Sequence, residues 1–267
     1  MNNAAPIGVF DSGIGGLTVV RELMRQLPNE SIIYFGDTAR VPYGPKSPDT
    51  VVRYSREITE FLRGEGVKAV VVACNTATAH ALPTLRAEND LPIVGVIEPG
   101  SRAAARATKT KRVGVIGTQG TIRSGAYERA ITSVEPGANI TALACPLFVP
   151  LVEEGWLDTE ATRLIAREYL GPIADADVDT LVLGCTHYPL LRDVLANVAH
   201  EITGREIAVV DSASAMAQAA REALGSGPNH RTQAGRLDCF ATDTSRLDEL
   251  APRFLGEPLT GFELVDL

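Results

Sequence analysis

The chain has 267 residues, of which 45% are hydrophobic, enough to build the core of one large or two smaller domains. Its formal net charge of -8 argues against nucleic acid or an anionic membrane surface as the main partner. The first residues lack the basic and apolar regions of a secretory leader, and no later run approaches the ~20 apolar residues of a membrane span. We therefore expect a soluble, cytoplasmic protein whose four cysteines are free thiols.

The first predicted strand is Ile7-Gly8-Val9-Phe10, and a glycine-rich turn and an amphipathic helix follow it. This turn resembles a dinucleotide fingerprint, and Asp37 after the next strand (Ser31 to Phe35) keeps that hypothesis open. Thr18 in place of the third glycine weakens it, and so does the Asp11 carboxylate, which would lie where a pyrophosphate must come. Asp11 fits a catalytic or orienting carboxylate better, with a helix N-cap as the alternative.

A proline-rich segment from Asp37 to Pro48 follows, and it is unsuited to a helix or an inner strand. We expect a stiff loop over the end of the sheet. Such loops often carry binding residues, and Tyr43 with the Gly44 amide would close over a small polar ligand. The alternative is a structural turn whose tyrosine covers the edge of the core.

Helices and strands then alternate, which predicts a mainly parallel α/β sheet. The pattern gives a helix from Asp49 to Arg63, a strand before Cys74, another helix, and a strand from Ile93 to Ile97. The alternation of strands and helices is interrupted at Glu98-Pro99-Gly100, and a short alanine-rich helix is expected after it.

The second part of the chain repeats the first. Val113-Gly114-Val115-Ile116 echoes the first strand at an offset of 106 residues, and Cys185 echoes Cys74 at an offset of 111. A near-constant offset predicts two related α/β units with a pseudo-two-fold arrangement and a crevice between them. We predict domains of 1–98 plus 209–267 and of 99–208, in which the last part of the chain completes the first domain; an independent tail domain is the alternative. The elements expected in that last part are a strand at 207–210, a helix at 214–224, a Gly-Ser-Pro-Asn loop, a strand at 237–241, a helix at 247–254 and a strand at 262–265.

Two of the cysteines follow continuous apolar runs, in Val70-Val71-Val72-Ala73-Cys74-Asn75-Thr76 and Thr180-Leu181-Val182-Leu183-Gly184-Cys185-Thr186-His187. Such runs indicate parallel strands buried on both faces, so both thiols would lie at strand carboxyl ends, where α/β proteins bind ligands. Helix amides after each thiol, and the imidazole of His187, favour the thiolate, and the same amides suit a carboxylate ligand. Cys145 and Cys239 lack such a polar turn and are interpreted as core residues.

Two thiols facing one ligand are the minimum apparatus for inverting a stereocentre, with a base on one face of a carbon and an acid on the other. Three alternatives stay open: inert buried thiols, a zinc site, and a two-lobed binder of small anions, whose usual secreted form needs a leader. The zinc set would be Cys74, His80, Cys185 and His187, with unusual ligand spacings. No lysine among Lys46, Lys68, Lys109 and Lys111 lies at a strand carboxyl end, so a route without pyridoxal phosphate or another cofactor is favoured.

The motifs Val9-Phe10-Asp11-Ser12-Gly13-Ile14-Gly15-Gly16-Leu17, Tyr43-Gly44, Ala73-Cys74-Asn75-Thr76 and Leu183-Gly184-Cys185-Thr186-His187-Tyr188-Pro189 together resemble those of bacterial glutamate racemases, in the aspartate/glutamate racemase superfamily. The resemblance implies cofactor-independent, two-base conversion of L-glutamate to D-glutamate for peptidoglycan. Cys74 and Cys185 would be the acid and base, and Asp11, His187 and Glu153 auxiliary proton-handling residues. Glu154, beside Glu153, is the alternative for the last role.

The resemblance also implies the substrate contacts. These are Asp11, Ser12, Tyr43, Gly44, Asn75, Thr76, Thr186 and His187, with Thr118 and Thr121 from the second unit. No metal is implied. Aspartate differs from glutamate by one methylene, which pocket packing distinguishes by only ~1–3 kcal/mol, so the motifs leave that choice open. Family members are often dimers in more than one arrangement, and a homodimer stays open as well.

Overall fold

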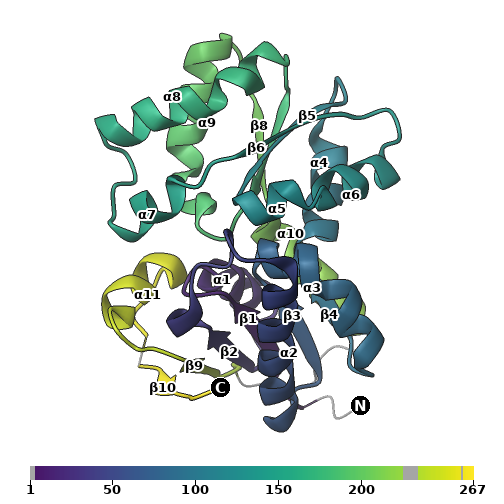
Figure 1. Ribbon diagram of the computed structural model, residues 1–267, viewed down its shortest axis with the longest axis vertical. Coiled ribbons are helices and arrows are strands. Elements are labelled where there is room, and N and C mark those ends of the chain that lie inside the picture. The colour runs from purple at the N-terminus through teal and green to yellow at the C-terminus, as the bar shows by residue number, and fades with distance from the viewer. Residues whose placement is uncertain (1–3, 225–233, 260) are drawn as a thin grey trace. The chain divides into compact units, whose positions relative to one another are not determined.

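The computed structural model describes residues 4–224, 234–259 and 261–267 (Figure 1). The chain forms two compact units. The first comprises Met1–Val96 with Ala213–Leu267, and the second comprises Ile97–Ser212.

The first unit contains a parallel sheet of six strands in the order β10-β9-β2-β1-β3-β4. Its strands are β1 (Ile7–Asp11), β2 (Ile32–Gly36), β3 (Ala69–Val72), β4 (Ile93–Gly95), β9 (Leu237–Ala241) and β10 (Glu263–Leu264). The helical elements are α1 (Leu17–Gln26), η1 (Thr38–Arg40), α2 (Pro48–Gly64), α3 (Asn75–Glu88), α10 (Ser212–Ala223, starting at the last residue of the second unit) and α11 (Leu247–Leu255). Side chains of α2 and α3 form one apolar cluster with the central strands, which include Phe10, Phe35 and Val72.

The second unit contains a parallel sheet of four strands in the order β6-β5-β7-β8. These are β5 (Arg112–Gly117), β6 (Asn139–Ala144), β7 (Thr180–Gly184) and β8 (Ala208–Asp211). The helical elements are α4 (Ile97–Ala107), α5 (Gln119–Arg123), α6 (Ala126–Val134), α7 (Phe148–Glu153), α8 (Glu160–Asp175), η2 (Tyr188–Leu191) and α9 (Arg192–Thr203). α4 packs against α6, and α8 packs against α9.

The two units share one topology. The order β2-β1-β3-β4 in the first corresponds to β6-β5-β7-β8 in the second, and every pairing is parallel. In each unit the thiol-bearing segment follows the strand beside the first strand of that unit. The prediction of two similar, mainly parallel α/β units is confirmed, and the equivalence of β3 and β7 explains why their sequences look alike.

The structure differs from the sequence prediction around Glu98-Pro99-Gly100. β4 ends at Gly95, α4 already begins at Ile97, and these three residues form its first turn. A proline is tolerated there because the first-turn amides have no partner within the helix. A Cβ on Gly100 would lie 3.2 Å from the Cβ of Ser212, so this close approach also favours glycine.

The unit boundaries also differ from 98 and 208. The first unit ends at Val96, and the second extends to Ser212 because β8 pairs with β7. A division after residue 208 would cut through β8. At the other end of the chain, β9 pairs with β2 and β10 with β9, so these strands belong to the first sheet (Figure 1). The predicted Gly-Ser-Pro-Asn loop lies outside the described residues.

In the part of the chain that the structure describes, none of the helices has the length and apolar character needed to cross a membrane.

Candidate active site

Cys74 lies at the carboxyl edge of the first sheet, where β3 gives way to α3. The Ala73 amide still donates to the Phe10 carbonyl at 2.9 Å, and Cys74 is then the N-cap of α3. Its Sγ accepts a hydrogen bond from the Ala77 amide at 3.4 Å and donates to Ser12 Oγ at 3.5 Å. The thiol is 5% exposed. The amide donor at the helix N-terminus suits a negatively charged sulfur, and the bond to Ser12 suits its protonated form, so the surroundings of Cys74 accommodate both.

Asp11 is the last residue of β1 and is almost fully buried. Its Oδ2 accepts a hydrogen bond from the Gly13 amide at 3.1 Å. The N-cap alternative for Asp11 is wrong, because the N-cap of α1 is Gly16, which makes no side-chain cap bond. A Cβ on Gly16 would lie 2.5 Å from the Asp11 Cβ, and this explains the glycine.

Asn75 and Thr76 form the first turn of α3 and are buried beside Cys74. Tyr43 belongs to the same apolar cluster as Cys74. Its hydroxyl donates to the Asp37 carboxylate, and the buried side chain covers the edge of the core. Burial raises the pKa of Tyr43, and the Asp37 charge raises it further, so the phenol stays protonated.

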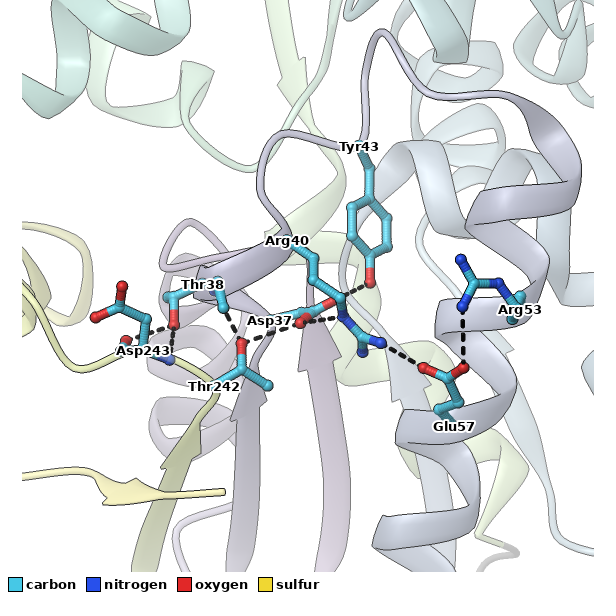
Figure 2. A network of polar contacts seen from close by, with 9 residues as sticks. Asp37, Thr38, Arg40, Tyr43, Arg53, Glu57, Thr242 and Asp243 are labelled. Carbon is cyan, nitrogen blue, oxygen red and sulfur yellow. Dashed lines mark hydrogen bonds and ion pairs between the residues drawn. The ribbon is translucent and has the colours of Figure 1, made fainter. Parts of the chain in front are cut away.

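The nucleotide hypothesis needed Asp37 to bind a ribose. The structure shows instead that the Asp37 carboxylate is 0% exposed and accepts hydrogen bonds from Tyr43, Arg40 Nε (2.9 Å) and Thr242 Oγ1 (3.0 Å), as Figure 2 shows. These partners occupy both carboxylate oxygens, so Asp37 is an internal structural acid rather than a ribose ligand.

Cys185 has the equivalent place in the second unit, directly after Gly184, the last residue of β7. The register pairs Gly117 with Gly184, which puts Thr118 next to Cys185 as Ser12 is next to Cys74. Gly184 has no room for a side chain: a Cβ would lie 2.9 Å from both the Ile116 carbonyl oxygen and Tyr127 Cε2. Tyr127, a buried residue of α6, therefore supports the strand end behind Cys185, and nothing in its helical sequence pattern signals this.

His187 connects Cys185 to a carboxylate. Its Nε2 lies 3.0 Å from Glu153 Oε1, and its Nδ1 lies 3.4 Å from Thr186 Oγ1. Burial alone would lower the pKa of His187, but its hydrogen bonds to Cys185 and Glu153 outweigh burial and raise the pKa to about 10. At neutral pH the raised pKa favours the imidazolium form of His187, with the Glu153 carboxylate as its partner.

The structure distinguishes the two candidate glutamates. The carboxylate hydrogen-bonded to His187 is that of Glu153, the last residue of α7, whereas Glu154 is the exposed C-cap of that helix. Thr118 is the N-cap of the short α5, where its Oγ1 lies 3.0 Å from that of Thr121 and accepts from the Thr121 amide at 3.3 Å.

The structure thus groups the predicted site residues into two sets. The first unit brings together Asp11, Ser12, Tyr43, Gly44, Cys74, Asn75 and Thr76, and the second Thr118, Thr121, Glu153, Cys185, Thr186 and His187. Cys145 and Cys239 are buried, which confirms them as core residues, and burial raises the pKa of each to about 12. The described residues contain no cluster of three or more His, Cys, Asp or Glu side chains suited to a metal ion.

Comparison with known proteins agrees with this geometry. The model of the Asp/Glu/hydantoin racemase family matches residues 7–220, so the chain belongs to that family. A glutamate racemase from Geobacter metallireducens is 53% identical over 256 residues, 95% of this chain and 93% of the relative. The crystal structure of a glutamate racemase isoform from Bacillus anthracis has a TM-score of 0.93 and 39% identity, and covers 100% of this chain and 99% of its own.

A glutamate racemase from Francisella tularensis, solved in complex with D-glutamate, has a TM-score of 0.91 and 34% identity, with 99% of this chain and 98% of that chain covered. Within the racemase family, the relatives that this chain resembles along almost its whole length are thus glutamate racemases, which are isomerases.

Proposed function

We propose that the chain racemises glutamate by a two-base mechanism without a cofactor, in the cytoplasm, and so supplies D-glutamate for peptidoglycan. The observation that carries the proposal is the duplicated thiol. In each unit a buried cysteine, Cys74 or Cys185, follows the equivalent strand. Cys74 bonds to Ser12, the neighbour of Asp11 in the chain, and two residues after Cys185 comes His187, which is bonded to Glu153. The glutamate racemases that share this fold support glutamate as the substrate. We propose in addition that the two compact units are the two domains of the enzyme, each contributing one thiol.

In the proposed reaction from L-glutamate, the Cys185 thiolate removes the α-proton, and the Cys74 thiol delivers a proton to the opposite face of the α-carbon. One C–H bond and the Cys74 S–H bond break, and a new C–H bond and a Cys185 S–H bond form. Only protons are transferred, so no atom changes its oxidation state. The thiols exchange roles in the reverse direction. The charges support this resting assignment: Cys185 lies beside the His187 imidazolium, whereas the Cys74 thiol donates to Ser12.

The remaining groups bind substrate and move protons. To reset the enzyme, the Cys185 thiol gives its proton to His187 as the imidazolium passes its own proton through Glu153 to solvent. Asp11 relays a proton from solvent to the Cys74 thiolate. The hydroxyls and amides of Ser12, Asn75 and Thr76, and of Thr118, Thr121 and Thr186, suit the two carboxylates and the ammonium of glutamate. The Gly44 amide completes this set on the first unit.

The test is activity on L-glutamate, D-glutamate and L-aspartate, followed by circular dichroism, with no added pyridoxal phosphate and with a metal chelator present. We expect each glutamate enantiomer to racemise, and we expect its rate to be the same in the presence and in the absence of the chelator. Dependence on pyridoxal phosphate, or loss in chelator with recovery on adding zinc, would contradict the cofactor-free mechanism. A higher kcat/KM for aspartate than for glutamate would reassign the substrate.

A further inference from the structure

The loop that carries Tyr43 and Gly44 has little regular backbone structure of its own. After η1 (Thr38–Arg40), the backbone bonds that the loop makes before α2 include one from the Lys46 amide to the Tyr43 carbonyl at 3.0 Å. Ser47 then caps α2 by accepting from the Thr50 amide. The loop's place at the sheet edge therefore depends on side-chain bonds.

Asp37 is at the centre of those bonds. Its amide donates to the Asp11 carbonyl at 3.1 Å, which fixes Asp37 beside the proposed proton-handling carboxylate. Its own carboxylate accepts the hydroxyl of Tyr43 on Oδ2 and the hydroxyl of Thr242 on Oδ1, while Arg40 Nε donates to both oxygens at 2.9 Å. A buried carboxylate with this many donors is held in one orientation, because losing any partner leaves a costly unsatisfied charge.

Residues near the C-terminus, Thr242 and Asp243, also bond to Asp37 and to the start of the loop. Thr242, which follows β9, donates to Asp37 and accepts from the Ala39 amide at 2.9 Å, and its own amide donates to the Gly36 carbonyl at 3.2 Å. The next residue, Asp243, uses only its backbone toward the loop, through its amide to Thr38 Oγ1 at 2.8 Å and its carbonyl from the same hydroxyl. Figure 2 shows Thr242 bonded to Asp37 and Asp243 bonded to Thr38.

On the outer side, Arg40 is fixed as well. Its guanidinium pairs with Glu57 of α2 and lies 4.1 Å from the centre of the Tyr54 ring. Arg40 therefore connects the buried Asp37 carboxylate to α2, the helix that follows the loop. The start of the loop and the helix after it are thus both linked to Asp37.

We propose that Asp37 is a positioning residue for substrate binding: its buried carboxylate holds Tyr43, and with it the Gly44 amide, in the place where the loop contacts glutamate. This inference rests on the proposed function, because it assumes that the loop binds the substrate. Asp37 reaches the ligand only through Tyr43 and takes no part in proton transfer. Its loss should therefore weaken binding of ground state and transition state alike, which raises KM and leaves kcat nearly unchanged.

The test is steady-state kinetics of Asp37→Asn in both directions, with Asp243→Asn as the matched control. Asp243→Asn makes the same chemical change one residue from Thr242, where only backbone atoms meet the loop, and should leave KM unchanged. For Asp37→Asn we expect KM to rise on the order of 10-fold or more, the scale of one charged hydrogen bond, with kcat within about threefold of wild type. A folded Asp37→Asn protein with wild-type KM, or one that loses kcat alone, overturns the proposal.

Tyr43→Phe removes the hydroxyl that donates this hydrogen bond to Asp37, and it replaces Asp37→Asn as the test if that variant does not fold. It should raise KM by a similar factor, and the double variant should be no worse than the more impaired single variant, because the two residues act through one bond. Unchanged KM in Tyr43→Phe, or additive effects in the double variant, contradicts the inference. If the wild type fails to racemise glutamate, the proposed function fails; if it racemises glutamate and only the KM effects are missing, the positioning role alone fails.

Discussion

Replacing Cys74 or Cys185 by serine is expected to abolish racemisation, a loss on the order of 10⁴-fold, at the upper end of what one positioned acid-base group contributes. A hydroxyl is far less acidic than a thiol and a poor base at neutral pH, so either substitution stops one half of the proton transfer. The measurement is turnover by circular dichroism from each enantiomer, with thermal unfolding to show that the variants fold.

The controls are Cys145→Ala and Cys239→Ala. Both thiols are buried with a pKa raised to about 12, so neither is a thiolate at neutral pH, and turnover should stay within a few-fold of wild type. A thiol alkylator should inactivate wild type and both controls, with glutamate protecting. Resistance of either control variant to the alkylator would show that the reactive thiol had been assigned wrongly.

Replacing His187 or Asp11 by asparagine is expected to lower turnover by ~10²-fold or more with the fold intact. Each variant keeps a similar side-chain shape but loses the ability to hold or move a proton beside its thiol. Near-normal turnover in both would make them packing residues only.

The pH profile separates the proton role of His187 from a structural one. In the wild type the pKa of His187 is raised to about 10. Activity that needs the imidazolium form should therefore decline only as the pH rises through that value. Glu153 helps to raise this pKa, and Glu153→Gln should therefore move the alkaline decline to lower pH. Glu154→Gln, one residue further at the exposed end of α7, should leave the decline where it is. Equal profiles in all three proteins would contradict the His187–Glu153 pair as a working unit.

The parts of the fold that could be predicted from sequence are those that local residue patterns indicate. β3 and β7 are short apolar runs because parallel strands are buried on both faces, and each run ends where a thiol and polar residues mark the sheet edge. The placement of both thiols at strand ends therefore followed from pattern and fold rules. The first turn of α4 was missed because Pro99 and Gly100 look like a break, although a proline fits a helix's first turn.

Contacts between distant parts of the chain left no such pattern. Thr242 meets Asp37 across 205 residues, and no local signal pairs them. Sequence left open whether Tyr43 closes over a ligand or covers the edge of the core, and no local signal indicated that its hydroxyl donates to Asp37. Glu153 and Glu154 are adjacent at a helix end, so only three-dimensional placement identifies which one reaches His187.

The central claim is that each thiol serves one face of the α-carbon, and isotope exchange in deuterated water tests it most directly. Wild type should place solvent deuterium at the α-carbon of the product as inversion proceeds. In each serine variant the remaining cysteine can still exchange the proton of the enantiomer that it faces. By family resemblance, Cys74→Ser should exchange mainly L-glutamate through Cys185, and Cys185→Ser mainly D-glutamate through Cys74. Mirrored preferences of this kind are the predicted result. A serine variant that remains an active racemase, or one that loses exchange of both enantiomers while the other keeps both, would contradict the two-base assignment.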